Sequence, residues 1–323
     1  MNNKSAWDGL SFFISSTHSQ KYLAACYQTL EVSEWEKRAY ENCFPFIYYL
    51  EHGKNYYTLA EHAPLSIQPV LLFYGMIQLL KACLLTVDPN YPESTILLAH
   101  GVTTRKRKKQ DYSFLHDEVK IQKHGLFTHA ADKLFHIKYI EGDKYTMDML
   151  MHRIAELYEL FFYSKKETKL LKVGVQNQRI ISIPVAVLDL YHMTDVRFQE
   201  YIKSTCSHLK LVPANLQNSE EILFETSIAW DGLRSSPLLY NYNEDAYFLP
   251  PSREMMTIFP EVLSHYLLLY NLSMISRYET EWWSELLRSY HSEDYPFIFQ
   301  FLSISAKKIP YYVYLYLINK IQG

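Results

Sequence analysis

The chain has 323 residues, a formal net charge of −3 and a hydrophobic content of 48%. This composition excludes a disordered chain, because burying that much apolar side chain, at about 25 cal/mol per Å², supports a large core. The slightly acidic balance also excludes a protein that coats nucleic acid over its whole surface, since such binding depends on neutralising phosphates.

Residues 1–100 carry helical spacing, and Pro45 predicts the end of one helix and the start of the next. Residues 69–87 are apolar on nearly every side, with Pro69 at the start and Asp88 followed by a proline at the end. This segment predicts a buried core helix. The charge of Lys81 and the length of the segment argue against a membrane span.

Residues 101–169 predict a basic loop, a short strand at 119–121 and further helices. Residues 170–250 are rich in strand-forming runs and open with a hairpin around residues 176–178. Further runs at 209–212, 222–226, 238–242 and 246–249 predict a small antiparallel sheet.

Residues 251–323 return to helical patterns, and the apolar segment 260–276 is the expected mate of the helix at 69–87. The prediction is an α+β fold that is mostly α. The N- and C-terminal regions form a helical core, and the small antiparallel sheet is inserted in the middle of one unit over residues 1–323.

The sharpest charged feature is a run of five cations just after His100, formed by Arg105, Lys106, Arg107, Lys108 and Lys109. Cations this dense repel one another unless an anionic partner compensates them. Two interpretations stand side by side: a solvated loop, and an anion- or partner-binding loop to which His100 contributes.

A second candidate site joins Lys81 to Arg277, one from each of the two apolar helices. The polar stripe of Tyr74, Gln78 and Lys81 recurs at helical spacing. Arg277 either caps the carbonyls of its own helix or points with Lys81 between the two helices, where exclusion of water strengthens anion binding.

Motifs for catalysis and cofactors are missing: no glycine-rich phosphate loop, no zinc-protease motif and no spaced Cys and His ligands. We therefore expect no metal and no cofactor. Glu118 and Lys120 match only the end of a nuclease motif, which an ordinary strand edge also explains. The scattered histidines, His100, His116, His124, His129 and His136, favour structural roles.

The four cysteines, Cys26, Cys43, Cys83 and Cys206, have no paired spacing, and the N-terminus lacks a basic segment followed by an apolar one. Both features predict reduced thiols and a cytoplasmic protein.

Three segments together resemble the YaaC-like proteins of Bacillus and relatives: FPFIYYLEHGKNYYTLAEHAPLSIQPVLLFYGMIQLLKACLLT, AHGVTTRKRKK and SMISRYETEWW. That family has no agreed enzymatic activity. Its genes often neighbour the gene for IMP dehydrogenase, so the resemblance implies a link to purine nucleotide supply and a protein partner, with IMP dehydrogenase as the candidate.

A weaker similarity, in the paired helices and the SRY-x₃-W segment, links the chain to HEPN-type helical domains, which include RNA-binding proteins and ribonucleases. Those ribonucleases carry Arg, four to six residues, and then His. Here Arg277 meets no His before His291, and only two residues separate Arg288 from His291. We therefore expect a non-catalytic binding or regulatory protein, with a HEPN-like RNA-binding protein or ribonuclease as the alternative.

Overall fold

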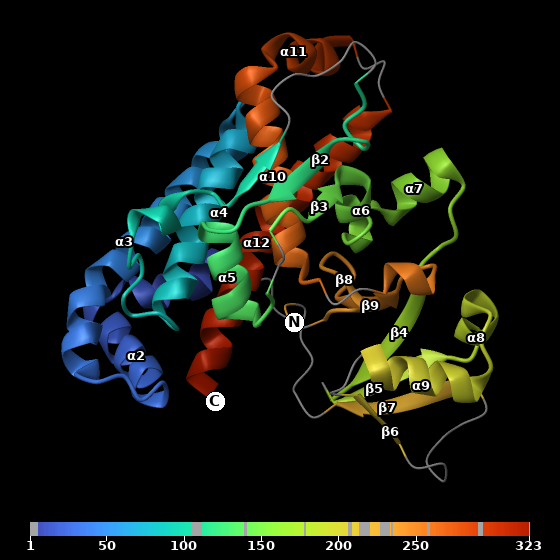
Figure 1. Ribbon diagram of the computed structural model, residues 1–323, viewed down its shortest axis with the longest axis horizontal. Helices are drawn as coiled ribbons and strands as arrows, with labels where there is room; N and C mark the ends of the chain where they lie inside the picture. Colours follow the sequence, from blue (N-terminus) through green and yellow to red (C-terminus); the bar gives the residue numbers. More distant parts are fainter. Residues whose placement is uncertain are drawn as a thin grey trace. The chain divides into compact units, whose positions relative to one another are not determined.

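The computed structural model describes residues 6–104, 112–138, 141–177, 179–205, 209–212, 220–226, 233, 235–256, 259–289 and 293–322 (Figure 1). The chain divides into two units. Unit 1 contains Met1–Leu150 and His265–Gly323, and unit 2 contains Met151–Ser264. The helical unit is thus built from the two ends of the chain, and the middle of the chain forms the other unit.

Unit 1 is mainly helical, as its apolar periodicity predicts. Its N-terminal helices are α1 (Ala6–Leu10), the short 3-10 turn η1 (Ser11–Ile14), α2 (Ser16–Thr29), α3 (Trp35–His62) and α4 (Gln68–Leu85). Its C-terminal helices are α10 (Glu261–Tyr278), which belongs to unit 1 from His265 onward, α11 (Thr280–Ser289) and α12 (Asp294–Gln322). Figure 1 shows α2, α3 and α4 side by side.

The predicted core helix is confirmed, and α4 begins at Gln68 with Pro69 in its first turn. Among the described residues it is the one helix long and apolar enough to cross a membrane, but 67% of that span is buried inside the protein. Its apolar surface is covered chiefly by α3 and α12. The side chains of α10 also reach it, because the ring of Phe73 lies 5.3 Å from that of Tyr266.

The prediction that Pro45 separates two helices is wrong, because α3 runs unbroken from Trp35 to His62. A proline inside a helix removes one hydrogen bond and costs about 3 kcal/mol. The burial of Cys43, Phe46 and Ile47 around it explains why the helix continues.

Helices α3 and α4 approach closely through two glycines. A Cβ at Gly75 would lie 2.8 Å from the ring of Tyr57, and a Cβ at Gly53 would lie 2.7 Å from the side chain of Leu79. Only hydrogen fits at either position, so these glycines let the two helices pack as a pair.

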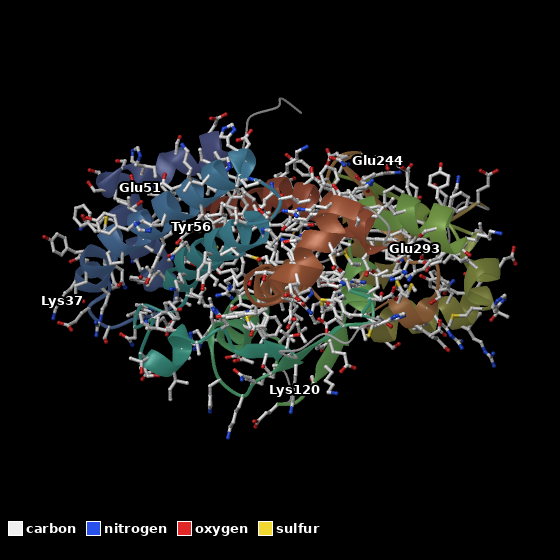
Figure 2. All side chains as sticks on the ribbon, turned by 90° about the horizontal axis from the view of Figure 1, so that it is seen from above. Lys37, Glu51, Tyr56, Lys120, Glu244 and Glu293 are labelled. Carbon is white, nitrogen blue, oxygen red and sulfur yellow. The ribbon has the colours of Figure 1, made fainter. Side chains whose placement is uncertain are left out.

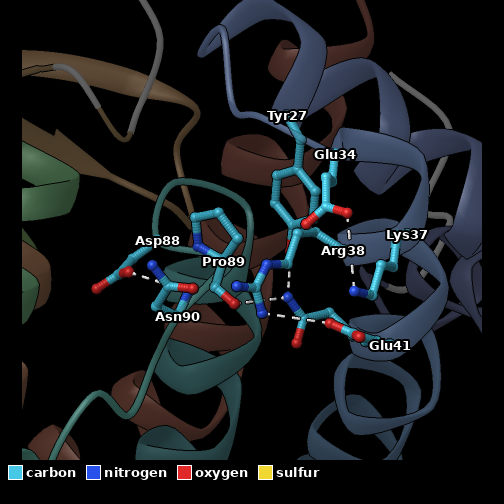
Figure 3. A network of polar contacts seen from close by, with 9 residues as sticks. Tyr27, Glu34, Lys37, Arg38, Glu41, Asp88, Pro89 and Asn90 are labelled. Carbon is cyan, nitrogen blue, oxygen red and sulfur yellow. Dashed lines mark hydrogen bonds and ion pairs between the residues drawn. The ribbon is translucent and has the colours of Figure 1, made fainter.

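A polar network joins α2, α3 and the end of α4 (Figure 3). The Asn42 amide donates to the Tyr27 hydroxyl at 2.9 Å and to the Pro89 carbonyl at 2.8 Å. The Tyr27 hydroxyl donates in turn to the Leu85 carbonyl at 2.8 Å. These bonds satisfy carbonyls at and beyond the C-terminus of α4.

A three-stranded antiparallel sheet completes unit 1, with strand order β1 (Val102–Thr104), β2 (Glu118–Ile121) and β3 (Lys144–Thr146). The predicted strand at 119–121 is therefore confirmed. Short helices flank the sheet along the chain: η2 (Thr95–Leu98), α5 (Leu126–Phe135) and α6 (Met147–Met151).

Unit 2 contains a six-stranded antiparallel sheet with the order β6-β7-β5-β4-β9-β8. Its strands are β4 (Leu171–Gln176), β5 (Ile180–Pro184), β6 (Leu209–Leu211), β7 (Glu221–Thr226), β8 (Leu239–Asn241) and β9 (Ala246–Leu249). The predicted hairpin is β4 paired with β5, with Gly174 opposite Ser182. The fold is α+β and mostly α, as predicted, but its strands form two sheets instead of one.

Helices α8 (Val187–Tyr191) and α9 (Asp195–Thr205) pack on this sheet through a shared apolar core that includes Phe198 and Phe224. A second apolar cluster joins η3 (Ala155–Leu157) and α7 (Tyr158–Lys165) to β8 and β9. The turn η5 (Arg253–Met255) follows β9. The alternating burial of β7 reflects the period of two in an extended strand.

Candidate functional site

Lys81 contributes the first positive charge of the candidate site. It lies on α4, the most apolar helix of unit 1, and its side chain is only half-buried. Its ammonium lies 5.6 Å from the centroid of the Tyr49 ring on α3. Burial lowers the pKa of Lys81. Within the described part of the chain, no carboxylate forms an ion pair with this ammonium.

His100 lies on a loop whose backbone carbonyls accept hydrogen bonds from elsewhere in unit 1. The Tyr266 hydroxyl donates to the His100 carbonyl at 2.8 Å, and the Leu126 N–H donates to the Ala99 carbonyl at 2.7 Å. Gly101 adopts φ +77° and Gly125 adopts φ +136°, and their backbones approach too closely for a Cβ on Gly125. The two glycines therefore permit the close backbone approach next to His100.

Aromatic rings surround the His100 imidazole. The centroids of Phe73, Tyr270 and Tyr74 lie 5.1, 5.7 and 6.1 Å from it. Its Nδ1 atom is buried and has no hydrogen-bond partner among the described residues. A buried nitrogen of this kind is costly unless a water molecule or a ligand forms a hydrogen bond with it.

Arg277 lies in the last turn of α10 and makes the capping contact, one of the two alternatives that the sequence left open. Its Nε donates to the Ser273 carbonyl at 2.9 Å, which is the capping role. Its guanidinium also lies 6.0 Å from the centroid of the Tyr74 ring on α4. Among the described residues, no carboxylate forms an ion pair with Arg277.

The electrostatic field of both cations acts on one imidazole. Burial is the main cause that lowers the pKa of His100, and the charges of Arg277 and then Lys81 lower it further. His100 is therefore neutral at pH 7. Burial raises the pKa of Tyr270, and the Arg277 guanidinium opposes that rise. The Tyr74 ring thus lies between Arg277 and His100, 6.0 Å from the guanidinium and 6.1 Å from the imidazole, and we refer to Lys81, His100 and Arg277 together as the cationic cluster.

The other predicted positions differ in their environments. The run Arg105 to Lys109 lies outside the described residues. Glu118 lies on β2 and its carboxylate accepts from the Lys144 ammonium at 3.1 Å, as expected of a strand edge. His129 bonds Asp88 at 2.8 Å. The described residues contain no group of three or more His, Cys, Asp or Glu that could hold a metal ion.

Sequence reasoning missed a buried polar network in unit 1. The Asp117 carboxylate accepts from the Tyr112 hydroxyl and the Asn271 amide, each at 2.9 Å. The Asp294 carboxylate accepts from the Phe114 N–H at 2.7 Å. Only the position of Asp294 at the start of a long helix could have indicated such a role. The network anchors the segment that follows the basic run to α10 and α12.

Fold and site together define a two-unit α+β protein with a cationic cluster in its helical unit. A family model described as YaaC-like protein matches residues 11–317, and the chain therefore belongs to the YaaC-like family. No curated protein and no solved structure matches the chain.

Proposed function

We propose that this YaaC-like protein is a binding or regulatory protein, not a catalyst, and that Lys81, His100 and Arg277 recognise an anionic group of its ligand. One observation carries the proposal: two cations without carboxylate partners in the described part of the chain act on His100, which is partly buried and whose buried Nδ1 has no hydrogen-bond partner among the described residues. Where water is excluded, hydrogen bonds between cations and an anion are strong.

The family relationship adds the chemical class to be tested. Because the family relationship implies a link to purine nucleotide supply, we propose a nucleotide phosphate as the anion. For the same reason we propose IMP dehydrogenase as the protein partner. The Arg105 to Lys109 run would then supply a further contact for either one. A nucleotide ligand and IMP dehydrogenase as partner are both consistent with the proposal that the protein acts in the cytoplasm.

Binding of sulfate, pyrophosphate and nucleoside monophosphates, measured by calorimetry, tests the proposal. Lys81→Met and Arg277→Met should each weaken binding roughly 10- to 100-fold, because each removes one charge-assisted hydrogen bond. Lys123→Met and Arg288→Met are matched controls, since both side chains are exposed. Equal affinities for all four variants would refute the site.

The pH dependence of sulfate binding gives an independent test. The two cations lower the pKa of His100, and a bound anion compensates them, so binding should raise that pKa. Affinity should therefore increase as the pH falls through the His100 range, with proton uptake on binding. Sulfate does not itself titrate there. The His100→Gln variant should bind with little pH dependence.

The RNA alternative makes a different prediction. Arg277 lacks a histidine at HEPN ribonuclease spacing, and His291 lies outside the described residues. Mixed single-stranded and structured RNA should stay intact with and without Mg²⁺ or Mn²⁺. Cleavage that disappears in Arg277→Ala or His291→Ala would establish the ribonuclease instead.

A further inference from the structure

Helix α3 exposes three aromatic side chains in a line. Tyr40, Phe44 and Tyr48 are 66%, 50% and 54% exposed, and the rings of Phe44 and Tyr48 lie 6.1 Å apart. Residues four apart lie on the same side of a helix, so the three side chains form one stripe. An exposed apolar stripe of this kind marks an interaction surface.

The residues of this stripe and its flanks are arranged symmetrically about Phe44. Tyr40 and Tyr48 lie four residues on either side of it. Lys37 lies seven residues before it and Glu51 seven residues after it. Seven residues are about two helical turns, so both charges return to the side of the stripe. Figure 2 labels Lys37 and Glu51 on the helical unit.

We propose that a second copy of this chain docks on the stripe, with the two α3 helices antiparallel and a two-fold axis at Phe44. Each Phe44 then meets its own copy, and each Tyr40 meets Tyr48 of the other copy. Each Lys37 meets Glu51 of the other copy. A two-fold interface requires such self-complementarity, in which residue i contacts j and j contacts i. A parallel pair would instead place like charges together.

The two flanking charges are available for this contact. Within its own chain Lys37 pairs with Glu34 at 3.8 Å, but both side chains are about two-thirds exposed, at 63% and 66% (Figure 3). Pairs this exposed contribute little. Glu51 has no ion pair among the described residues.

The first test is the mass of the full chain in solution over a concentration series, measured by light scattering or sedimentation. Wild type should be a dimer, and Phe44→Asp a monomer, because it places two carboxylates against each other at the axis. Tyr163→Asp is the matched control, since Tyr163 is 75% exposed and lies on α7. A monomeric wild type, or a Phe44→Asp dimer as stable as wild type, would overturn the proposal.

A charge-swap test fixes the antiparallel register. Lys37→Glu and Glu51→Lys should each weaken self-association by about tenfold or more, because two symmetric attractions become two repulsions. Mixing these two variants should restore association, since both charge pairs are then complementary again. The doubly substituted chain should also recover. Failure of the mixture to associate better than either variant by itself would refute the register, whatever the outcome of anion binding.

Discussion

At the scale of single residues, Lys81 gives the most direct test of the proposed anion site. It sits in an apolar core helix, burial lowers its pKa, and no described carboxylate pairs with it. A charge in this position costs folding free energy that an apolar side chain of similar length would not. An anionic ligand bound by the ammonium, as proposed above, would account for a charge at this position.

Replacing Lys81 with methionine should therefore separate stability from binding. The free energy of unfolding of the Lys81→Met variant should exceed that of wild type by about 0.5 to 2 kcal/mol, because methionine places no charge in the partly buried position. The same variant should lose affinity for sulfate. Chemical denaturation at pH 7 measures the first effect. A destabilised variant would mean that the ammonium has a structural partner.

His100 predicts a pH dependence of stability. Its pKa is lowered in the folded state, so the unfolded chain binds more protons between the folded pKa and the ordinary value of 6.5. The free energy of unfolding should consequently decrease as the pH falls from 6.5 to the pKa of His100 in the folded protein. Below that pKa the contribution of His100 no longer changes with pH. Unfolding curves of wild type and His100→Gln at a series of pH values should differ in this window. Parallel pH profiles would contradict the burial of a neutral imidazole.

At the scale of elements, the pairing of α3 with α4 depends on Gly75. Its missing Cβ leaves space for the ring of Tyr57, which is itself 5% exposed and has little room to move. The pairing also holds Lys81 near Tyr49. The geometry of the cationic cluster therefore depends on this helix contact.

The Gly75→Leu variant should be destabilised by about 1 to 3 kcal/mol or more through overpacking, despite the better helix propensity of leucine. Thermal melting measures the change. Ser303→Leu provides the control, since Ser303 is exposed on α12 and should tolerate the same side chain. An unchanged midpoint for Gly75→Leu would disprove the close approach of α3 and α4.

At the scale of the whole molecule, the five cations from Arg105 to Lys109 oppose a net charge of −3. A local potential of sign opposite to the whole protein steers an anionic partner to one place. The Asp117 and Asp294 network holds the segment that follows these cations.

Reversing Lys106, Arg107 and Lys108 to glutamate should abolish most of the salt dependence of partner binding while leaving the melting temperature nearly unchanged. Affinity at two salt concentrations, for wild type and the triple variant, measures this. Purified IMP dehydrogenase is the first partner to try, with a short RNA as the control. With RNA, the logarithm of affinity should fall by about 0.7 units per contacted phosphate and decade of salt. Equal binding by both proteins at both salts would identify the run as a solvated loop.

The sequence by itself determined the local elements. Apolar periodicity and Pro69 predicted α4, and alternation with turn residues predicted the β4 and β5 hairpin, because these signals act between residues close in the chain. The prediction of a helix end at Pro45 was wrong. The free-energy cost of a proline within a helix arises locally, whereas the burial that outweighs this cost comes from elements distant in the sequence.

Only the tertiary structure decided which residues meet. Lys81, His100 and Arg277 were each candidates from sequence, but only the packing of α4 and α10 places the Tyr74 ring 6.0 Å from the Arg277 guanidinium and 6.1 Å from the His100 ring. The same holds for the buried network of Asp117, whose partner Asn271 lies 154 residues away. Contacts across such separations arise from the summed burial of whole helices, and no local pattern of residues encodes them.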